Sequence, residues 1–235
     1  MFRLAKIQVP IFVTLLLTFC LSMALCQKSV RPPDYGNIVR AVQRDDTVLV
    51  KKLLYAGVTV NRPKGKTAPG SAGDKTPLMI AAEHGNLTIL NLILARGASL
   101  EERATSGYFT ALYLAVQKGH KGCVAALLAH GANPNTANID DEPVLLPAAE
   151  RYPDIATMLI ARGANVNGRD IGGGTVLMRA VEAGHLKLVR LLLDKNADVY
   201  RKDEGGETAL TFARKQRNKD ILRVIQSAMA KSVRK

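Results

Sequence analysis

The stretch that decides the fold is Thr76–Ala98, which reads TPLMIAAEHGNLTILNLILARGA. Its first residues predict a helix start, because the hydroxyl of Thr76 can cap a first turn and Pro77 is tolerated there. Gly85 breaks the helical pattern, and a second segment then carries apolar residues at helical spacing, namely Leu90, Ile93 and Leu94. Gly97 is suited to end that segment, since glycine readily adopts a positive φ. The stretch therefore predicts two short helices joined by a tight turn.

Copies of this unit recur along the chain. The residues that end the second segments are Gly57, Gly97, Gly131, Gly163 and Asn196, and subtracting successive numbers gives spacings of 40, 34, 32 and 33 residues. Other matching starts and turns are Thr110-Ala111-Leu112, Gly119-His120, Val144-Leu145, Thr175-Val176-Leu177, Gly184-His185 and Thr208-Ala209-Leu210. A period of about 33 residues with these internal signals resembles the ankyrin-repeat family. The resemblance implies an all-α solenoid of about six helix-turn-helix repeats with short hairpin loops.

One position departs from the pattern of that family. Ankyrin repeats commonly carry histidine after Thr-Pro-Leu, and here the place is taken by Met79, Tyr113, Leu146, Met178 and Thr211. We therefore expect the family's hydrogen-bond network between repeats to be absent, with apolar packing in its place.

Three local irregularities are also expected. Residues 62–74, RPKGKTAPGSAGD, lengthen the first spacing and predict an exposed loop, which is either a contact site or a tolerated insertion. In the fourth repeat Arg151-Tyr152 replaces the Gly-His turn, and Pro153 is expected to begin the second helix. In the last repeat Arg217-Asn218 replaces that turn and Gln226 follows Ile225, as expected of a polar terminal repeat.

The N-terminus differs in composition from the repeats. Residues 1–26 combine a basic head, an apolar run over Ile11–Leu25 and small residues before cuts after Ala24 or Cys26. This order predicts a secretory signal peptide, with a retained membrane anchor and a lipoprotein as alternatives. The expected division of the chain is signal peptide 1–26, linker 27–34, repeat domain 35–230 and basic tail 231–235.

Cysteine usage agrees with export. The three cysteines are Cys20, Cys26 and Cys123, so removal of the first two would leave one thiol and no disulfide. Cys123 adjoins the predicted core position Val124 and is expected to be a buried structural thiol. We expect a periplasmic location, while translation from Met23 would give a minor cytosolic form.

Charge and motifs restrict the functional classes. The 235 residues carry a net charge of +13, which favours acidic partners. Nucleic acid is not expected, because no RNP pattern, zinc-finger spacing or helix lined with arginine and lysine is present. Attachment to anionic lipid through the basic tail is a further alternative. No catalytic motif is found, so we expect no enzyme activity, no cofactor and no metal. Histidines His120 and His185 occupy Gly-His turns and are expected to be structural, and His84 and His130 are isolated.

The ankyrin resemblance implies recognition of another protein through the hairpin tips and the exposed face of the first helices. Two aromatic residues, Tyr108 and Phe109, are the strongest candidates, with the alternative that one of them packs beneath the next hairpin. The other candidates, by position, are Glu142 and Glu207 at hairpins and Glu83, His84, Gln117, Lys118, Glu150, Arg151 and Glu182 on helices.

A small exported bacterial ankyrin protein of this kind is similar to the immunity proteins of type VI secretion lipase effectors. That likeness implies an antitoxin that covers a toxic effector, such as a phospholipase, in a stoichiometric complex. The alternative is a periplasmic ankyrin scaffold that stabilises another protein without inhibiting it.

Overall fold

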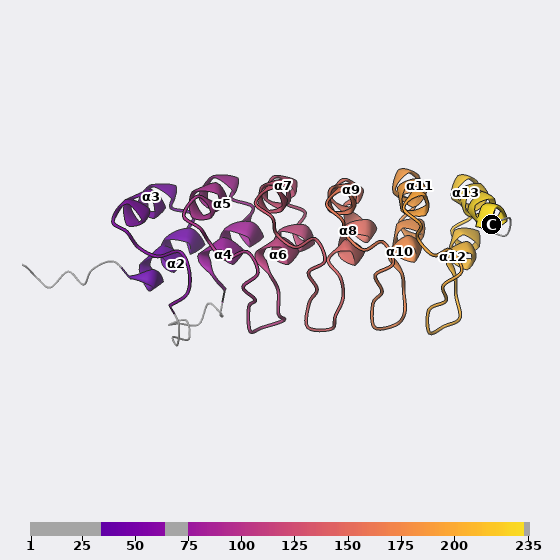
Figure 1. Cartoon of the computed structure of the whole chain (residues 1–235), viewed down its shortest axis with the longest axis horizontal. Helices are drawn as coiled ribbons and strands as arrows, with labels where there is room; N and C mark the ends of the chain where they lie inside the picture. The colour runs from indigo at the N-terminus through magenta and orange to yellow at the C-terminus, as the bar shows by residue number, and fades with distance from the viewer. Residues whose placement is uncertain (1–33, 64–74, 233–235) are drawn as a thin grey trace, which may run out of the picture. The chain divides into compact units, whose positions relative to one another are not determined.

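The computed structural model describes residues 34–63 and 75–232 (Figure 1). The expected signal peptide, the linker up to Pro33 and residues 64–74 of the insertion lie outside the described residues. The described helices form consecutive pairs: α2 (Tyr35–Gln43) and α3 (Thr47–Tyr55), α4 (Pro77–His84) and α5 (Leu87–Leu94), α6 (Ala111–Gln117) and α7 (Lys121–Ala129), α8 (Leu145–Arg151) and α9 (Pro153–Ala161), α10 (Val176–Glu182) and α11 (Leu186–Asp194), α12 (Ala209–Lys215) and α13 (Lys219–Ser232). The prediction of an all-helical array of helix-turn-helix repeats is confirmed for these ranges.

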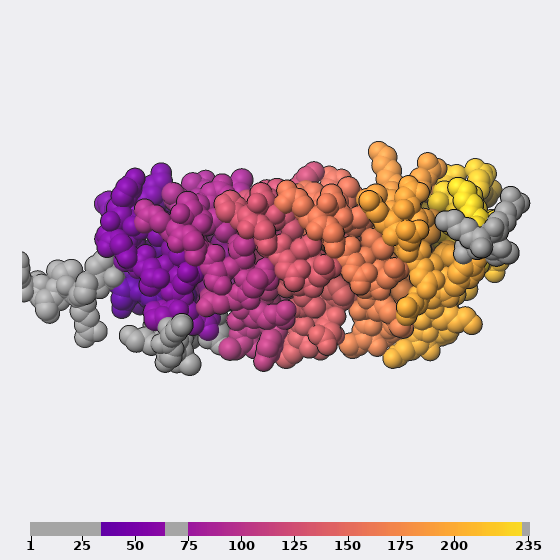
Figure 2. Space-filling view, in the orientation of Figure 1, coloured from indigo at the N-terminus to yellow at the C-terminus, as the bar shows by residue number. Residues whose placement is uncertain are grey.

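Two layers of helices make up the compact unit that begins at Tyr35. The first helix of each pair packs on the first helix of the next pair, from α2 to α12, and the second helices pack likewise from α3 to α13. Hairpin loops between the pairs project on the side of the first helices (Figure 1). Figure 2 shows the pairs following one another in chain order. Each pair is therefore buried mainly by its immediate neighbours.

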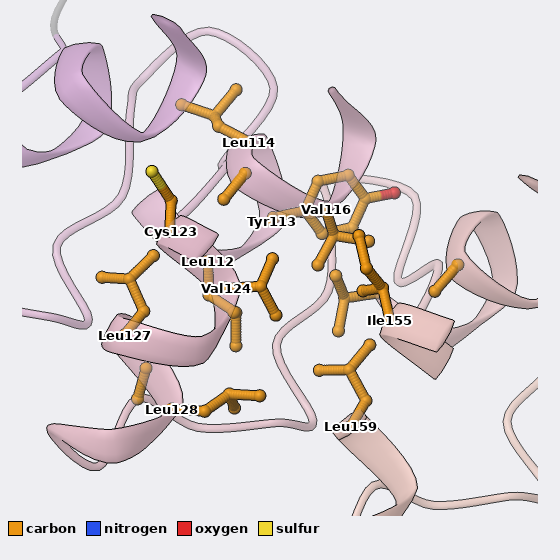
Figure 3. Packing of buried hydrophobic residues seen from close by; sticks show 14 of the residues in the cluster. Leu112, Tyr113, Leu114, Val116, Cys123, Val124, Leu127, Leu128, Ile155 and Leu159 are labelled. Carbon is orange, nitrogen blue, oxygen red and sulfur yellow. The ribbon is translucent and has the colours of Figure 1, made fainter. Parts of the chain in front are cut away.

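The core is a continuous apolar layer between successive pairs. In the centre, Val124 of α7 lies on the side of Ile155 and Leu159 of α9, while Leu127 lies on the other side of α7, and all four belong to the buried core (Figure 3). Each of these side chains is at most 2% exposed, which is the burial expected of a fully packed core. Because both helices of a pair contribute to the layer, the apolar face of one repeat is complete only when the next repeat is present.

The ends of the second helices match the sequence prediction. Gly57, Gly97, Gly131 and Gly163 have φ of 79°, 72°, 90° and 87°, and Asn196 has φ of 62°. Glycine and asparagine adopt this left-handed conformation at the lowest cost, and the turn frees the chain to leave the helix. The five residues thus repeat one conformation as well as one spacing.

The residues that take the family's histidine position still serve the helix start. The sulfur of Met79 lies 3.4 Å from the backbone nitrogen of Thr76, and Met178 and Thr175 repeat this arrangement at 3.4 Å. Each threonine hydroxyl in turn accepts from the backbone nitrogen of its methionine, at 3.3 and 3.2 Å. The expectation of buried apolar packing at these positions is confirmed for both methionines.

Hydrogen bonds between repeats do occur, and they come from residues outside the family's histidine position. Asn61, Asn135 and Asn167 form what we call the asparagine ladder. The side chain of Asn135 donates to the carbonyl of Gly163 at 3.2 Å and accepts from the backbone nitrogen of Asn165 at 2.7 Å. Asn61 and Asn167 repeat the same two bonds to the repeats that follow them. Asparagine suits this place because its amide both donates and accepts.

Two of the equivalent positions carry a residue other than asparagine. Glu101 stands where the next asparagine would be and accepts from the backbone nitrogen of Asn133 at 2.8 Å, without a donor of its own. At the last interface Tyr200 takes the place, and its hydroxyl donates to the carbonyl of Met229 in α13 at 3.0 Å. The polar connection thus changes in kind at the second and the last interfaces.

Other local predictions are also met. Pro153 is the first residue of α9, and Cys123 is buried in α7. Burial raises the pKa of the Cys123 thiol to about 11. Arg217 has φ of 55° at the turn before α13, so it adopts the left-handed conformation that glycine has in other repeats.

Candidate functional site: the hairpin edge

Each of the last three hairpins is closed by one side chain near its start. The Oδ1 atoms of Asn138, Asp170 and Asp203 accept from the backbone nitrogen four residues later, at 2.9, 2.8 and 2.8 Å. Asn and Asp favour such turns because their short side chains reach their own backbone. The hairpins therefore share one conformation, and the residues at equivalent places along them are in register.

Neighbouring hairpins are also joined to one another by backbone hydrogen bonds. The nitrogen of Ile139 donates to the carbonyl of Gly107 at 3.1 Å, and the nitrogen of Glu204 donates to the carbonyl of Gly172 at 2.9 Å. These bonds place residues from successive repeats next to each other along a common edge.

Tyr108 occupies an unusual backbone conformation on this edge. Its φ is 56°, and the equivalent residues of the next hairpins are Asp141 (55°), Gly173 (78°) and Gly206 (77°). A side chain with a Cβ in this region costs roughly 1–2 kcal/mol. The tyrosine is 51% exposed, so burial of its ring does not account for its presence there. Strain at an exposed position is a feature of contact and functional sites.

Two isoleucines extend the exposed apolar surface along the edge. Ile139 and Ile171 follow Asn138 and Asp170 directly, and they are 60% and 78% exposed. Together with Tyr108 they place one large apolar side chain on each of three successive hairpins. We call these three residues the hairpin row. Neither isoleucine was predicted from the sequence as a contact residue, although the matched pairs Asn138-Ile139 and Asp170-Ile171 were a signal that could have identified them.

The second predicted aromatic contact, Phe109, is placed differently from Tyr108. Its ring centroid lies 5.1 Å from that of Tyr113, and the side chain packs partly buried against the core. Phe109 therefore contributes to the core rather than to the exposed edge. Tyr108 alone of this pair is presented to solvent.

The predicted hairpin acids are both engaged within the chain. Glu142 is half-buried and lies 3.4 Å from the hydroxyl of Tyr113 and 3.1 Å from the side-chain nitrogen of Asn138. Burial, with a contribution from Glu142, raises the pKa of Tyr113 above its ordinary value. Glu207 forms an ion pair with Lys215.

The predicted helix residues lie near the ends of the first helices, and most of the charged ones are paired. Glu83 contacts Lys75 at 2.7 Å and His84 contacts Asp45 at 3.3 Å, while Glu150 lies 3.7 Å from Arg151. Glu182 contacts Arg179 at 3.3 Å. The side chains of Gln117 and Lys118 in the third repeat are exposed. These residues are distributed over four repeats, and the structure does not gather them into an enclosed site.

One charged cluster was not anticipated. Arg179 of α10 contacts Asp170 of the preceding hairpin at 2.6 Å, so it fixes the hairpin to the helix. Hydrogen bonding to Asp170, together with the charges of Asp170 and Glu182, raises the pKa of Arg179. The pair holds the hairpin that carries Ile171.

Histidine and metal chemistry can be assessed from the same geometry. A ring nitrogen of His120 lies 2.9 Å from the carbonyl of Glu83, and His185 lies 3.1 Å from the carbonyl of Glu150. Both link one repeat to another, as a structural role requires. Within residues 34–63 and 75–232, no group of three His, Cys, Asp or Glu side chains is arranged to hold a metal ion. In the same ranges no helix has the length and apolar character needed to cross a bilayer.

Comparison with known proteins gives one family and several relatives. The family model "Ankyrin repeats (3 copies)" matches residues 38–138 and 143–234. Relatives include the ankyrin repeat and KH domain-containing protein mask-1 of Caenorhabditis elegans, with 34% identity over 76% of this chain and 6% of that protein. A mitochondrial disaggregase of Bos taurus is 31% identical over 67% of this chain and 24% of its own length. The chain thus spans a minor part of these relatives.

One solved structure is similar to this chain over nearly the whole length of the solved chain. It is a chain of the complex between the Bd0816 predatory endopeptidase of Bdellovibrio bacteriovorus and immunity protein Bd3460. The TM-score is 0.67 at 26% sequence identity, and the match covers 83% of the present chain and 99% of the other.

Proposed function

Since the chain belongs to the ankyrin-repeat family, whose arrays mediate protein binding, we propose that it is an immunity protein that inhibits a toxic enzyme by covering it. The protein-binding role follows from the family and from the array of repeats. The inhibitory role is the further step, and it assigns the hairpin edge to contact with the effector.

The hairpin row is the observation that carries this proposal. It places Tyr108, Ile139 and Ile171 at exposed positions on three neighbouring hairpins. Interfaces depend on a few large anchors, among which tyrosine is over-represented, surrounded by polar residues that exclude water. The predicted residues of the first helices, such as Lys118 and Glu150, can form such a polar rim.

The solved complex supports the inhibitory role. A chain similar to this one over most of its length occurs there in an assembly of an endopeptidase and an immunity protein. We propose an effector that is likewise a hydrolase. A phospholipase delivered by type VI secretion is the effector that the sequence resemblance implies, and the solved complex adds a peptidase as a second hydrolase to assay.

The proposed place of action is the periplasm. The basic head and apolar run of residues 1–26 support export, and a repeat domain with Cys123 as its single cysteine needs no disulfide there. A scaffold for another periplasmic protein would share this location, and it differs from an inhibitor in leaving its partner active.

A capture experiment tests the proposal. The wild-type chain and a Tyr108→Ser/Ile139→Ser/Ile171→Ser variant are used to isolate partners from the periplasm of the native organism, with Leu87→Ser on α5 as an exposed apolar control. We expect wild type and control to retain one enzyme that the triple variant loses. Titration with the wild-type chain should abolish the enzyme's hydrolase activity at one equivalent.

Two results would contradict the proposal in different ways. A captured partner that keeps full activity in the complex would indicate a scaffold. Equal capture by the triple variant would show that the hairpin row does not bind the partner, even if inhibition were observed.

A further inference from the structure

We propose that the outward face of α3 attaches the array to an anionic lipid bilayer surface. The helix carries Val48, Lys51, Lys52 and Tyr55 at positions i, i+3, i+4 and i+7, so these side chains share one face. We call these four residues the basic stripe. The opposite side of the helix is buried in the array through Val50, Leu53 and Leu54. This attachment is independent of the hairpin row and of the identity of any protein partner.

The apolar members of the basic stripe are unusually open to solvent. Val48 is 65% exposed and Tyr55 is 84% exposed. The guanidinium of Arg96 lies 5.9 Å from the centroid of the Tyr55 ring. A tyrosine ring flanked by long cationic side chains is typical of the lipid–water interface, where the ring lies at headgroup depth and the cations reach the phosphates.

The charge of this face selects an anionic surface. Lys51 and Lys52 are exposed, and neither takes part in an ion pair within the described part of the chain. The nearest acids in sequence are already engaged: Asp46 caps α3 by accepting from Leu49 at 2.9 Å, and Asp45 lies 3.2 Å from the side-chain nitrogen of Asn86. The two lysines are therefore available to bind external anions.

The neighbouring helices place no charge beside the basic stripe at the equivalent positions. In α5 these positions are Thr88, Asn91, Leu92 and Ala95, and in α7 they are Gly122, Ala125, Ala126 and Ala129. Over α3, α5 and α7 a bilayer can therefore approach without desolvating an acid at these positions. An acidic protein would be expected to need hydrogen-bonding partners from the adjoining helices, and these small side chains offer few. Lipid is therefore the occupant that the surface favours.

Vesicle sedimentation tests this inference. The chain is purified from an exporting host, its N-terminus is established by sequencing, and it is mixed with phosphatidylglycerol-containing or pure phosphatidylcholine vesicles. We expect wild type to sediment with the anionic vesicles only. Lys51→Gln/Lys52→Gln should weaken partitioning about 30-fold, since each cation near an anionic surface contributes roughly fivefold. Val48→Ser/Tyr55→Ser should remove the part of binding that persists at high salt.

The matched control is Lys187→Gln/Arg190→Gln on α11, which removes the same charge from the corresponding face of another second helix. All variants are compared with identical N-termini, so any contribution of the preceding residues cancels. Circular dichroism melts check that each variant is folded. An equal loss in the α11 control, no sedimentation of wild type, or equal binding to neutral vesicles would each overturn the proposal. Capture of an acidic protein lost in the α3 variant, without vesicle binding by wild type, would assign this face to a protein instead.

Discussion

At the scale of single residues, Tyr108 combines two properties that rarely occur together. It adopts the left-handed backbone conformation that two later hairpins assign to glycine, and its ring remains half in solvent. The adjacent Phe109 makes the ring contact with Tyr113 that stabilises the hairpin, so this stabilisation does not require Tyr108. Tyr108 lowers the folding stability through its backbone conformation and contributes little packing. Substitution at this position should therefore affect folding stability and partner affinity separately.

Tyr108→Gly should therefore change stability and binding in opposite directions. Relief of the backbone strain exceeds the added entropy of the unfolded glycine, so we expect a net stabilisation of roughly 0.5–1 kcal/mol. Partner affinity should fall at least tenfold because an aromatic anchor is lost. Urea unfolding and titration calorimetry measure the two effects, with Tyr108→Asn as the variant that tolerates the conformation and lacks the ring. A destabilised glycine variant would show that the ring supports the fold.

The thiol of Cys123 gives a second test at this scale. Burial raises its pKa from 9.0 to about 11, so the folded thiol should be neutral and unreactive toward a disulfide reagent at pH 8. The unfolded thiol ionises first as pH rises, so its contribution to stability should be constant below pH 9 and decline between pH 9 and about 11. Labelling rates with and without urea check the first part, and Cys123→Ala should lose this alkaline slope. Rapid labelling of the native chain would contradict the burial.

At the scale of helices and their connections, the asparagine ladder fixes how one repeat follows the next. Each amide accepts from one backbone group and donates to another in the following repeat, so it sets the position of that repeat along two bonds. Glu101 makes only the accepting bond, at 2.8 Å. The second interface thus has one ladder bond fewer than the third and the fourth, although His120 and Ile139 join the same two repeats by other hydrogen bonds.

Asn135→Ala should destabilise the array by about 1–2 kcal/mol, since two partly exposed hydrogen bonds are lost. Asn135→Asp keeps the accepting bond and loses the donating one, so we expect roughly half that effect at neutral pH. Chemical denaturation of the three proteins measures the difference. The control is Asn91→Ala on the exposed face of α5, which should be close to neutral. Equal stability of Asn135→Ala and wild type would show that the ladder is dispensable.

The sequence allowed the helical pairs and their ends to be predicted, because glycine at a positive φ and threonine at a helix start act locally. Contacts between repeats were harder to predict from the sequence. The bond from Asn135 reaches a residue 28 positions away, and the pattern gave the spacing of the asparagines without their partners. The different roles of Tyr108 and Phe109 were likewise undetermined, since neighbouring residues in a turn can face the core or solvent. Exposure of Ile139 depends on the hairpin conformation as a whole.

At the scale of the whole molecule, the main contacts between the described helices lie within each pair and between neighbouring pairs of the array. Cooperative unfolding then depends on every interface being strong enough to couple the repeats on its two sides. A defect in the middle should have a different effect from a defect at one end, even where the lost side-chain contacts are alike.

Leu145→Ala should reveal this difference. The side chain is 1% exposed in α8, so truncation is expected to cost about 3 kcal/mol and to weaken the coupling between the two halves. We expect denaturant unfolding to separate into two transitions. Leu54→Ala in the first repeat should instead give early loss of that end followed by one main transition. Fluorescent labels placed in the two halves would measure both, and coincident transitions for Leu145→Ala would contradict this account.

The asparagine ladder also has a consequence for how such a protein can change in length. Each rung is encoded by the repeat that precedes its interface and bonds only to main-chain atoms of the next one. A duplicated segment of about one period would contain its own ladder asparagine. That side chain would find the same main-chain donor and acceptor in the following repeat wherever the segment was inserted. As far as these bonds are concerned, growth or shortening by whole repeats needs no compensating substitution in the adjoining sequence, whereas the terminal repeat, which relies on Tyr200 and α13, has to stay last.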